Sequence, residues 1–470
     1  MEFYLAGQWQ DRDDRIEVLN PAKGEVIDTV PKASADDIET ALVTAVEGAP
    51  EMAKLSGYRR FEILRRTADL MVENREDLAR TLSQEEGKTI HEARTEVDRA
   101  RQTIELSGEE AKRLTGEVLP LDGGEGVSGK LGFTLRVPCG VVAAITPFNF
   151  PLNLVCHKVG PALAGGNSVI LKPASDTPLV ALKFVKLLLE AGLPAKGIST
   201  LTGSGGTIGS KLCSDNRVRK ISFTGSQEVG EKICHAAGIK KVTMELGSNS
   251  PLIVLPDADL DKVVNAVVAS GYANAGQVCI SAQRLIVDER MHDELMQRLI
   301  PKVQSIVAGD PLQEETQMGP MVRESDAVRV EEWIQEAVSQ GAKLACGGER
   351  NGAFVSPALI LESKPDMKIV NDELFGPGVA VSRARDIDDA IRMANDTRYG
   401  LSAGIFTQDI DSAVRFAKEV QSGNIHINWG PMWRTDSMPY GGLKDSGLGK
   451  EGPKYAIEEM TESKTVVIHS

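Results

Sequence analysis

The spacing of apolar positions along the chain changes twice, and each change predicts a different kind of structure. Between about residues 33 and 114, apolar residues recur every three or four positions, which predicts amphipathic helices. From residue 140 to 246 the pattern becomes short β-branched runs separated by helical segments such as 179–191. The predicted strands of this region are 141–146, 168–171, 198–201, 220–223 and 241–245. Strands that alternate with helices predict βαβ units and a parallel sheet.

A second α/β region is predicted over residues 248–441, and its strands are 252–254, 284–287 and 404–406. Two further segments stand outside these patterns. The glycine-rich stretch 116–132 breaks the helical pattern before a strand at 133–137, and we interpret it as an excursion between domains. The apolar run 463–469 predicts a strand without a partner nearby in sequence. Such an edge tends to pair with another sheet, which includes the sheet of another subunit.

Composition excludes several classes of protein. A chain of 470 residues that is 41% hydrophobic and 26% charged can bury large cores, so we expect two or more domains rather than disorder. The net charge is -14 and the basic residues are scattered, which argues against a nucleic-acid partner. We find neither a secretory signal in residues 1–14 nor an apolar run that could span a bilayer. The six cysteines, Cys139, Cys156, Cys213, Cys234, Cys279 and Cys346, form no CxxC pair or metal-binding cluster. We therefore expect a cytoplasmic protein without a metal site or a membrane partner.

Two glycine-rich segments are candidates for phosphate binding. TGSGGTIGS (202–210) and FTGSQEVG (223–230) each follow a predicted strand and open a helix, where backbone amides can bind an anion. The first departs from GxGxxG because Ile208 stands where the third glycine belongs. A turn that brings strand and helix close together explains either segment equally well. Lys172, just after a strand, could contact a ribose or phosphate, or it could be a solvated surface lysine.

Three separated residues supply the groups that a thiolate enzyme needs. Cys279 is the candidate nucleophile, Glu245 a candidate base and Asn149 a candidate oxyanion donor. Each has a simpler explanation when taken alone. A lone cysteine is usually an inert buried residue, and an isolated Glu or Asn often caps a helix or forms a turn.

Seven segments in the same order resemble the aldehyde dehydrogenase superfamily, and the resemblance covers essentially the whole chain. They are TPFNFP (146–151), LKPAS (171–175), FTGSQEVG (223–230), MELGSNSP (244–251), NAGQVC (274–279), NDELFGP (371–377) and MPYGGLKDSGLGKEG (438–452). The resemblance implies an α/β fold with a Rossmann-like cofactor domain, 1–115 and 134–247, and an α/β catalytic domain, 248–446. It also implies a small β bridge for oligomerisation, 116–133 and 447–470, and a homodimer or homotetramer.

The same resemblance assigns chemical roles. Cys279 would attack an aldehyde, Asn149 and the Cys279 backbone N–H would hold the oxyanion, and Glu245 would activate the water that hydrolyses the thioester. Relatives that acylate coenzyme A tend to lack this glutamate, so its presence favours release of a free carboxylate. Two alternatives stay open. One is transfer of the acyl group to coenzyme A or phosphate, and the other is a non-catalytic binding or structural protein on the same fold.

The implied cofactor is NAD or NADP. The resemblance places Lys172 on the adenosine ribose, Ser226 on the pyrophosphate and Glu373 on the nicotinamide ribose, with Phe375 beside it. Phe148, where many relatives have tryptophan, is expected to be a packing residue. Further cofactor contacts fall on Thr146, Pro147, Gly205, Phe223, Gly225 and Leu246.

Ser175 bears on the choice between the two cofactors. Many NAD-preferring relatives have a glutamate at this position, where a carboxylate accepts from the ribose hydroxyls and repels a 2′-phosphate. Serine tolerates that phosphate. We therefore expect NADP to be accepted and do not exclude the use of both cofactors.

Substrate residues are predicted on one helix and one loop. Asn153 and His157 lie four and eight residues after Asn149, which places them on one helical face toward the expected substrate tunnel. Arg434 lies in a loop that lines the tunnel mouth in relatives. Together these residues favour a small anionic or hydroxylated aldehyde such as lactaldehyde, glycolaldehyde or phosphonoacetaldehyde.

Other residues qualify this prediction. Arg99 and Arg101 lie on a helix that borders the tunnel in relatives. Ala273 replaces the arginine of the succinate semialdehyde type, which argues against that substrate. Alternatively, the arginines pair with neighbours such as Asp436, and His157 is a core histidine.

Overall fold

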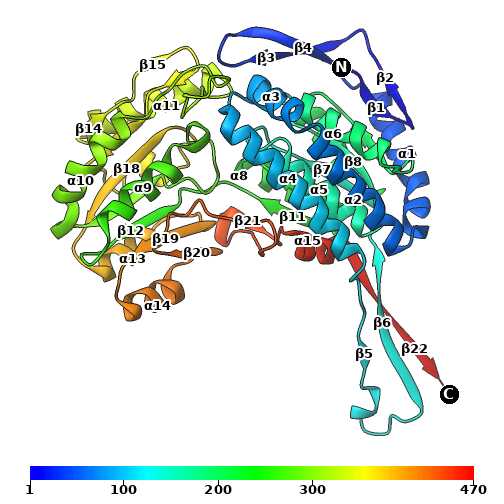
Figure 1. Ribbon diagram of the computed structural model, residues 1–470. Helices are drawn as coiled ribbons and strands as arrows, with labels where there is room; N and C mark the ends of the chain where they lie inside the picture. Colours follow the sequence, from blue (N-terminus) through cyan, green and yellow to red (C-terminus); the bar gives the residue numbers. More distant parts are fainter. Residues whose placement is uncertain (470) are drawn as a thin grey trace.

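Two open sheets occupy the two halves of the molecule in the computed structural model, which describes residues 1–469 (Figure 1). Within these residues the first sheet has six strands in the order β21-β11-β10-β7-β8-β9. Their bounds are β7 (Val141–Ile145), β8 (Ser168–Lys172), β9 (Ile198–Thr200), β10 (Val218–Thr224), β11 (Lys241–Glu245) and β21 (Gly447–Leu448). Strands β7 to β11 are parallel neighbours and match the strands predicted from the sequence. The predicted α/β fold is thereby confirmed.

Helices alternate with these strands as the pattern predicts. They are α5 (Asn153–Ala164), α6 (Leu179–Glu190), α7 (Gly205–Ser214) and α8 (Gln227–Ala237). Both glycine-rich segments run from a strand end into the first turns of a helix, α7 and α8 respectively. Strand β21 comes from the end of the chain and pairs antiparallel with β11, with Gly447 opposite Glu245.

The N-terminal region contains the predicted helices and, before them, two hairpins that the pattern did not predict. The helices are α1 (Ala35–Lys54), α2 (Gly57–Glu73), α3 (Arg75–Glu86) and α4 (Ile90–Ala111). The hairpins are β1 (Phe3–Leu5) with β2 (Gln8–Gln10) and β3 (Arg15–Asn20) with β4 (Glu25–Pro31). Their strands are too short or too exposed for a clear alternation, and β1 is fixed by a long-range bond from Tyr4 N to Thr200 Oγ1 at 2.7 Å.

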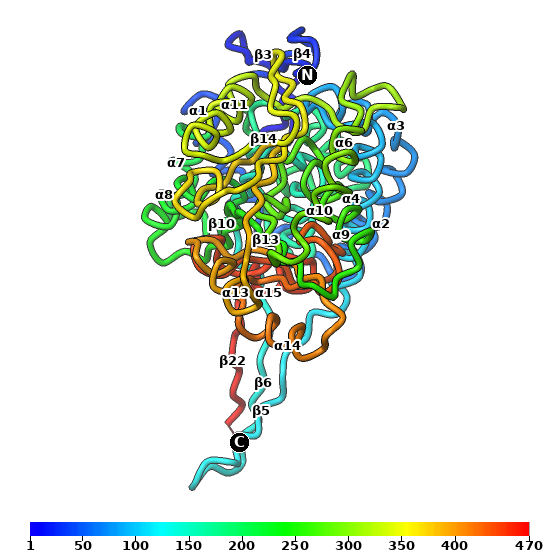
Figure 2. Tube along the Cα trace, turned by 90° about the vertical axis from the view of Figure 1, so that its left-hand side faces the viewer, coloured from blue at the N-terminus to red at the C-terminus, as the bar shows by residue number. Residues whose placement is uncertain are grey.

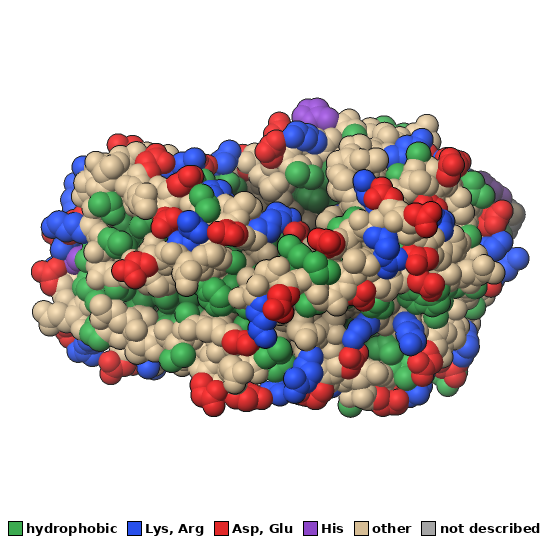
Figure 3. Space-filling view, turned by 90° about the horizontal axis from the view of Figure 1, so that it is seen from above, with side chains coloured by type: hydrophobic (Ala, Val, Ile, Leu, Met, Phe, Trp, Pro, Cys, Tyr) green, Lys and Arg blue, Asp and Glu red, His purple; other side chains and the backbone are tan. Residues whose placement is uncertain are grey.

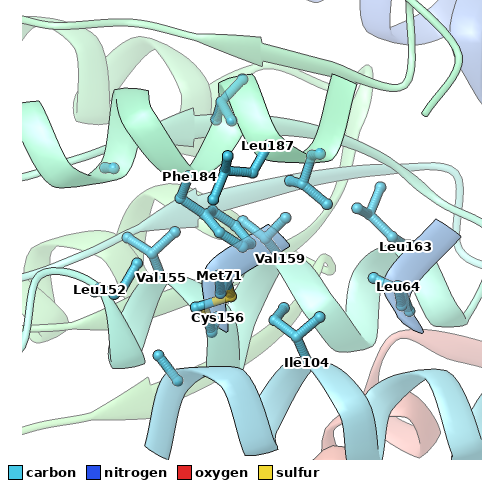
Figure 4. Packing of buried hydrophobic residues seen from close by; sticks show 14 of the residues in the cluster. Leu64, Met71, Ile104, Leu152, Val155, Cys156, Val159, Leu163, Phe184 and Leu187 are labelled. Carbon is cyan, nitrogen blue, oxygen red and sulfur yellow. The ribbon is translucent and has the colours of Figure 1, made fainter. Parts of the chain in front are cut away.

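Helix α5 is buried along its whole length, which fixes the side chains that it presents to the site. Figure 4 shows its apolar residues packed among neighbouring helices: Val155, Cys156, Val159 and Leu163, with Leu152 just before the helix, lie near Leu64 and Met71 of α2, Ile104 of α4, and Phe184 and Leu187 of α6. Each such side chain contributes about 1.5–3 kcal/mol when fully buried. The position of α5 is therefore strongly determined.

The second sheet has seven strands within residues 1–469, in the order β14-β17-β18-β13-β12-β19-β20. They are β12 (Pro251–Val254), β13 (Arg284–Asp288), β14 (Lys343–Cys346), β17 (Ala358–Leu361), β18 (Gly378–Ala384), β19 (Ser402–Phe406) and β20 (Asn424–Ile427). The main helices of this half are α9 (Leu260–Gly271), α10 (Glu289–Gln304), α11 (Glu324–Ser339), α13 (Ile387–Asn395) and α14 (Ile410–Glu419). A short hairpin, β15 (Arg350–Asn351) with β16 (Phe354–Val355), and α12 (Lys368–Asn371) complete it. The strands predicted at 252–254, 284–287 and 404–406 are confirmed.

An arm projects from the body in both views (Figures 1 and 2). It consists of β5 (Val118–Leu119), a short turn (Leu121–Gly123), β6 (Lys130–Pro138) and β22 (Thr461–His469). The C-terminal strand has no partner nearby in sequence, as predicted, and it pairs with another sheet: β22 lies antiparallel to β6 of the same chain along its whole length. The predicted bridge segment 447–470 also includes β21 and α15 (Pro453–Glu459), which pack against the first sheet and helices α4 and α5.

The surface carries both signs of charge. Figure 3 shows acidic and basic side chains interspersed over the face seen from above. Among residues 1–469, no helix is long and apolar enough to cross a membrane.

Candidate active site

A cleft of about 780 Å³ lies where loops of the two sheets meet. The loops after β7, β10 and β11 contribute to it from the first sheet, and the loop before β18 contributes from the second. The cleft brings together the sequence-predicted residues Pro147, Phe148, Asn149, Gly225, Ser226, Leu246, Cys279, Glu373 and Phe375. Arg329, Trp333, Asp372, Arg398 and Tyr399 also line it and were not predicted.

Cys279 follows a short 3-10 turn, Ala273–Gly276, in which Asn274 and Ala275 have left-handed backbone angles with φ of 50° and 51°. The thiol Sγ lies 3.2 Å from the hydroxyl of Tyr440. Burial raises the pKa of the Cys279 thiol to about 12, and the carboxyls of Glu373 and Glu245 act in the same direction. The Tyr440 hydrogen bond and the charge of Arg434 lower it.

Asn149 is held beside this thiol by hydrogen bonds on both its side chain and its backbone. Its Nδ2 donates to Gln277 O at 2.8 Å, and its carbonyl accepts from Lys88 Nζ at 2.6 Å and from Asn274 Nδ2 at 3.2 Å. One hydrogen of the amide group remains for a ligand, since an amide NH₂ has two.

Lys88 was not predicted, although it supports Asn149. The lysine is 1% exposed and forms a buried ion pair with Glu96 at 2.6 Å. Glu96 also accepts the backbone N–H groups of Leu152 and Asn153 at the start of α5. A buried lysine in a polar stretch gives no signal in the hydrophobic pattern, so only the structure reveals it.

Glu245 ends strand β11 and is 3% exposed. Neither of its carboxyl oxygens has a hydrogen-bond partner among the described residues. Burial, followed by repulsion from Glu451, raises the pKa of this carboxyl well above its usual range. A Cβ built on Gly441 would lie 3.0 Å from Glu245 Oε1, so the carboxyl faces the glycine turn that follows Tyr440.

Glu451 and Lys158 form a second buried pair that sequence reasoning missed. Lys158 Nζ lies 2.8 Å from Glu451 Oε1 and donates to Thr224 Oγ1 at 2.7 Å. Burial opposes the charge of Glu451, but the cations Lys158 and Arg434 outweigh it and lower the pKa of Glu451 to about 2. Two signals were available: Lys158 directly follows His157 on α5, and Glu451 lies within the motif 438–452.

The predicted adenosine-end residues lie near the start of α7. Lys172 is 5% exposed, and its ammonium makes no hydrogen bond within residues 1–469. Burial lowers the pKa of Lys172 to about 8. A Cβ on Gly205 would lie 3.9 Å from Lys172 Nζ, and Ser175 Oγ donates to Gly203 O at 2.8 Å.

These adenosine-end residues are not among those that line the cleft, whereas Glu373 is; it accepts a hydrogen bond from Ser248 N at 2.8 Å, and burial raises its pKa to about 7. Phe148 packs edge to face against Phe375 with ring centroids 5.9 Å apart. Phe223 and Thr146 are buried behind the cleft, and Thr146 Oγ1 has no partner in the part of the chain that is described.

On the far side of Cys279, the predicted substrate residues meet around Asp436. His157 Nε2 lies 2.9 Å from Asp436 Oδ1, and Asn153 Nδ2 donates to the same oxygen at 3.3 Å. Arg99 pairs with Asp436 at 2.8 Å. Arg101 does not join this cluster, because it pairs with Glu105 one turn along α4 at 2.6 Å.

Arg434 lies between this cluster and the thiol. Its Nη2 is 3.1 Å from His157 Nε2 and 3.4 Å from Glu451 Oε2. Its Nε has no partner among residues 1–469. The guanidinium carbon lies 3.9 Å from the ring centroid of Tyr440, so the arginine is stacked on the residue that contacts the thiol.

Comparison with known proteins decides the family. Residues 9–466 match the sequence profile described as the aldehyde dehydrogenase family. The chain belongs to the aldehyde dehydrogenase family. The resemblance inferred from the sequence motifs is thereby confirmed.

Three relatives of this aldehyde dehydrogenase are informative. The 3-sulfolactaldehyde dehydrogenase of Priestia aryabhattai is 46% identical over 99% of this chain and 97% of its own length. A crystal structure of an aldehyde dehydrogenase of Physcomitrella patens with the reaction product succinate has a TM-score of 0.97 and 39% identity, over 100% of this chain and 98% of that one. The glyceraldehyde-3-phosphate dehydrogenase of Methanocaldococcus jannaschii complexed with NADP has a TM-score of 0.95 and 39% identity, over 98% and 100%. This aldehyde dehydrogenase is an oxidoreductase that oxidises an aldehyde with NAD or NADP.

Proposed function

We propose that this aldehyde dehydrogenase oxidises a small anionic aldehyde to a carboxylate through a thioester on Cys279. The observation that carries the proposal is Arg434, a buried arginine beside the thiol whose Nε has no partner within residues 1–469. A buried guanidinium with a spare donor suits a carboxylate, phosphonate or sulfonate. The names of the three relatives support this class, because sulfolactaldehyde, succinate and glyceraldehyde 3-phosphate are all anions.

The residues present fit a nicotinamide dinucleotide. The cleft of about 780 Å³ reaches from Cys279 past Glu373, and the buried ammonium of Lys172 is free for ribose hydroxyls. We assign Lys172 and Ser175 to the adenosine end, Ser226 with the N-terminus of α8 to the pyrophosphate, and Glu373 to the nicotinamide ribose. The chemistry that a bound nicotinamide supplies is acceptance of a hydride from the tetrahedral adduct, after which Cys279 carries the acyl group as a thioester.

The chain's own residues perform the remaining steps. Cys279 Sγ adds to the aldehyde carbon, and the free amide hydrogen of Asn149 together with the Cys279 backbone N–H stabilises the oxyanion. Loss of one such donor typically costs about 2.7–4 kcal/mol. Water then attacks the thioester, Glu245 takes a proton from that water, and the carboxylic acid leaves as the sulfur regains a proton. Glu245 suits this role because its buried carboxyl makes no hydrogen bond among the described residues that would compete for the water.

The arm supports an oligomeric state. Leu131 and Ile468 on the arm are 53% and 51% exposed, and β22 is an edge strand of its sheet. An exposed edge with apolar side chains favours pairing with a second copy of the chain. We infer a homodimer or homotetramer that acts in the cytoplasm, and the mass in solution, measured by light scattering, distinguishes the two.

We assign residues 1–115 and 134–247 to the cofactor domain and residues 248–446 to the catalytic domain.

The test is the appearance of reduced nicotinamide. Purified enzyme is mixed with sulfolactaldehyde, phosphonoacetaldehyde, lactaldehyde, glycolaldehyde or propanal, with NAD and NADP in separate reactions and a Cys279→Ala control. We expect the anionic aldehydes to give the highest kcat/KM and the variant to be inactive. Preference for propanal would contradict the anionic class, and activity that requires added coenzyme A would contradict hydrolysis.

A further inference from the structure

The structure assigns a role in nucleophile activation to Tyr440: its hydroxyl donates to Cys279 Sγ and favours the thiolate, and Arg434 stacked on its ring holds and polarises it. Tyr440 is then a positioning residue, since it acts through Cys279. The inference rests on the proposed function only in taking Cys279 as the nucleophile.

Tyr440 is held in place from several directions. It is 3% exposed and packs with Val278, Ile280 and Leu401. Its backbone is bridged to Glu451 in both directions, with Tyr440 N to Glu451 O at 3.2 Å and Glu451 N to Tyr440 O at 2.7 Å. With the ring fixed, the hydroxyl stays 3.2 Å from Sγ at little cost in conformational entropy.

Either atom can donate while Cys279 is a neutral thiol, but a thiolate has no proton, so toward the thiolate the hydroxyl is the donor. Burial raises the pKa of Tyr440 well above its usual range, so the phenol keeps its proton throughout the working range of pH. A hydrogen bond to an ionised acceptor is roughly twice as strong as one between neutral groups. The contact therefore stabilises the thiolate more than the thiol.

The carboxyl groups near the thiol disfavour its ionisation, so the hydrogen bond from Tyr440 offsets an unfavourable environment. Glu373 and Glu245 both disfavour the thiolate, and burial acts in the same direction. Arg434 opposes them with its own charge and lies over the face of the Tyr440 ring, where a cation draws electron density from the phenol and strengthens its O–H as a donor. Glu451, bridged to the Tyr440 backbone, also contacts the guanidinium and fixes its position.

The two functions of Arg434 can be separated experimentally. In the proposed function it binds the anionic group of the substrate, whereas here it acts on Cys279 by its own charge and through Tyr440. An uncharged alkylating agent reports only the second function, because it has no anionic group for the arginine to bind.

The experiment measures alkylation of Cys279 by iodoacetamide in enzyme without cofactor, as rate against pH. The samples are wild type, Tyr440→Phe, Arg434→Met and their double variant, with Cys279→Ala to assign the labelled site. Loss of a hydrogen bond to a charged group raises a pKa by about one to two units. The remaining thiolate is intrinsically more nucleophilic, so the net expectation below the thiol pKa is about 3- to 10-fold slower alkylation of Tyr440→Phe.

Tyr4→Phe is the matched control. It also removes a phenol hydrogen bond, from Tyr4 OH to Ala195 O at 3.2 Å, but in the N-terminal hairpin region. We expect it to be alkylated at the wild-type rate, and equal thermal unfolding of all variants excludes a general structural effect.

The outcomes separate this inference from the proposed function. Wild-type alkylation rates in Tyr440→Phe at every pH would overturn the inference, and so would slowing in Tyr4→Phe as large as in Tyr440→Phe. If Arg434→Met slows alkylation less in the Tyr440→Phe background than in the wild type, part of its effect passes through the phenol, which supports the polarised pair; an equal slowing in both backgrounds contradicts it. If full alkylation of Cys279 in the wild type left aldehyde oxidation intact, the proposed function itself would fail.

Discussion

The two sides of Cys279 differ in how their polar groups are satisfied. On the cofactor side, the ion pairs along the open cleft of about 780 Å³ join partly exposed side chains such as Arg398 and Asp372, and the buried Lys172 ammonium makes no hydrogen bond within residues 1–469. On the aldehyde side, His157, Asp436, Glu451 and Lys158 are buried in a connected network of ion pairs and hydrogen bonds.

This difference indicates two modes of recognition. The cofactor side gains hydrogen bonds when a ligand enters, because its donors are incompletely paired. The polar groups of the aldehyde side are already paired with one another. Breaking one of these pairs would leave a buried group without a partner, and the free-energy penalty for that exceeds the usual net contribution of a hydrogen bond. Substrate binding there depends on the spare donor of Arg434. A single donor adds little to overall affinity, but it favours anionic over neutral aldehydes.

The largest effect is expected where the two sides meet, at Glu245. Glu245→Gln removes the base but keeps the shape, so the thioester forms and is then hydrolysed slowly. General-base catalysis contributes about 10²- to 10⁴-fold. Stopped-flow absorbance is expected to show a burst of about one equivalent of reduced cofactor per site, followed by a slow steady state. A steady-state rate equal to that of the wild type would rule out this assignment.

The aldehyde side is tested by Arg434→Met with anionic and neutral aldehydes of equal length. Loss of a charge-assisted hydrogen bond is expected to lower kcat/KM for the anion about 10- to 100-fold, and less for the neutral aldehyde. Arg101→Met is the matched control, because Arg101 pairs with Glu105 outside the cluster. Equal losses for both aldehydes would mean that Arg434 does not bind the anion.

The cofactor side is tested by Ser175→Glu. A carboxylate near the 2′-position repels the phosphate of NADP and accepts from the hydroxyls of NAD, so the ratio of kcat/KM for NADP to that for NAD is expected to fall about 10-fold. Ser175→Ala, which removes only the bond to Gly203, serves as the control. An unchanged ratio in Ser175→Glu would place the 2′-position elsewhere.

The smallest effect concerns Lys172 and pH. Burial lowers the pKa of its ammonium to about 8, so its charge is present below that pH and is lost above it. Cofactor affinity is measured by fluorescence quenching at pH 7 and at pH 9. Between these values the affinity of the wild type is expected to fall about fivefold more than that of Lys172→Arg, because arginine stays protonated. Parallel pH profiles would show that Lys172 does not contact the cofactor.

The sequence predicts some strands and site residues of this protein well and others not at all. Strands β7 to β11 are buried β-branched runs with helices between them, so periodicity locates them. Cys279, Asn149 and Glu373 lie in recognisable motifs, and the structure brings them to one cleft. Lys158, Glu451 and Lys88 were missed because a buried charge is paired only by the tertiary fold, and its residue type alone predicts exposure. Tyr440 was missed because its hydroxyl meets a residue 161 positions away.

Strand β21 has a consequence for the time at which the protein becomes active during its synthesis. The strand that presents Glu245 acquires its outer neighbour, Gly447–Leu448, only when that much later segment of the chain has emerged from the ribosome. Arg434, Tyr440 and Glu451 belong to the same late segment. A nascent chain that has folded strands β7 to β11 and already contains Cys279 therefore still lacks the groups that we propose to activate this cysteine. Reactivity toward aldehydes is therefore expected only after this late segment has been synthesised and has packed against the first sheet.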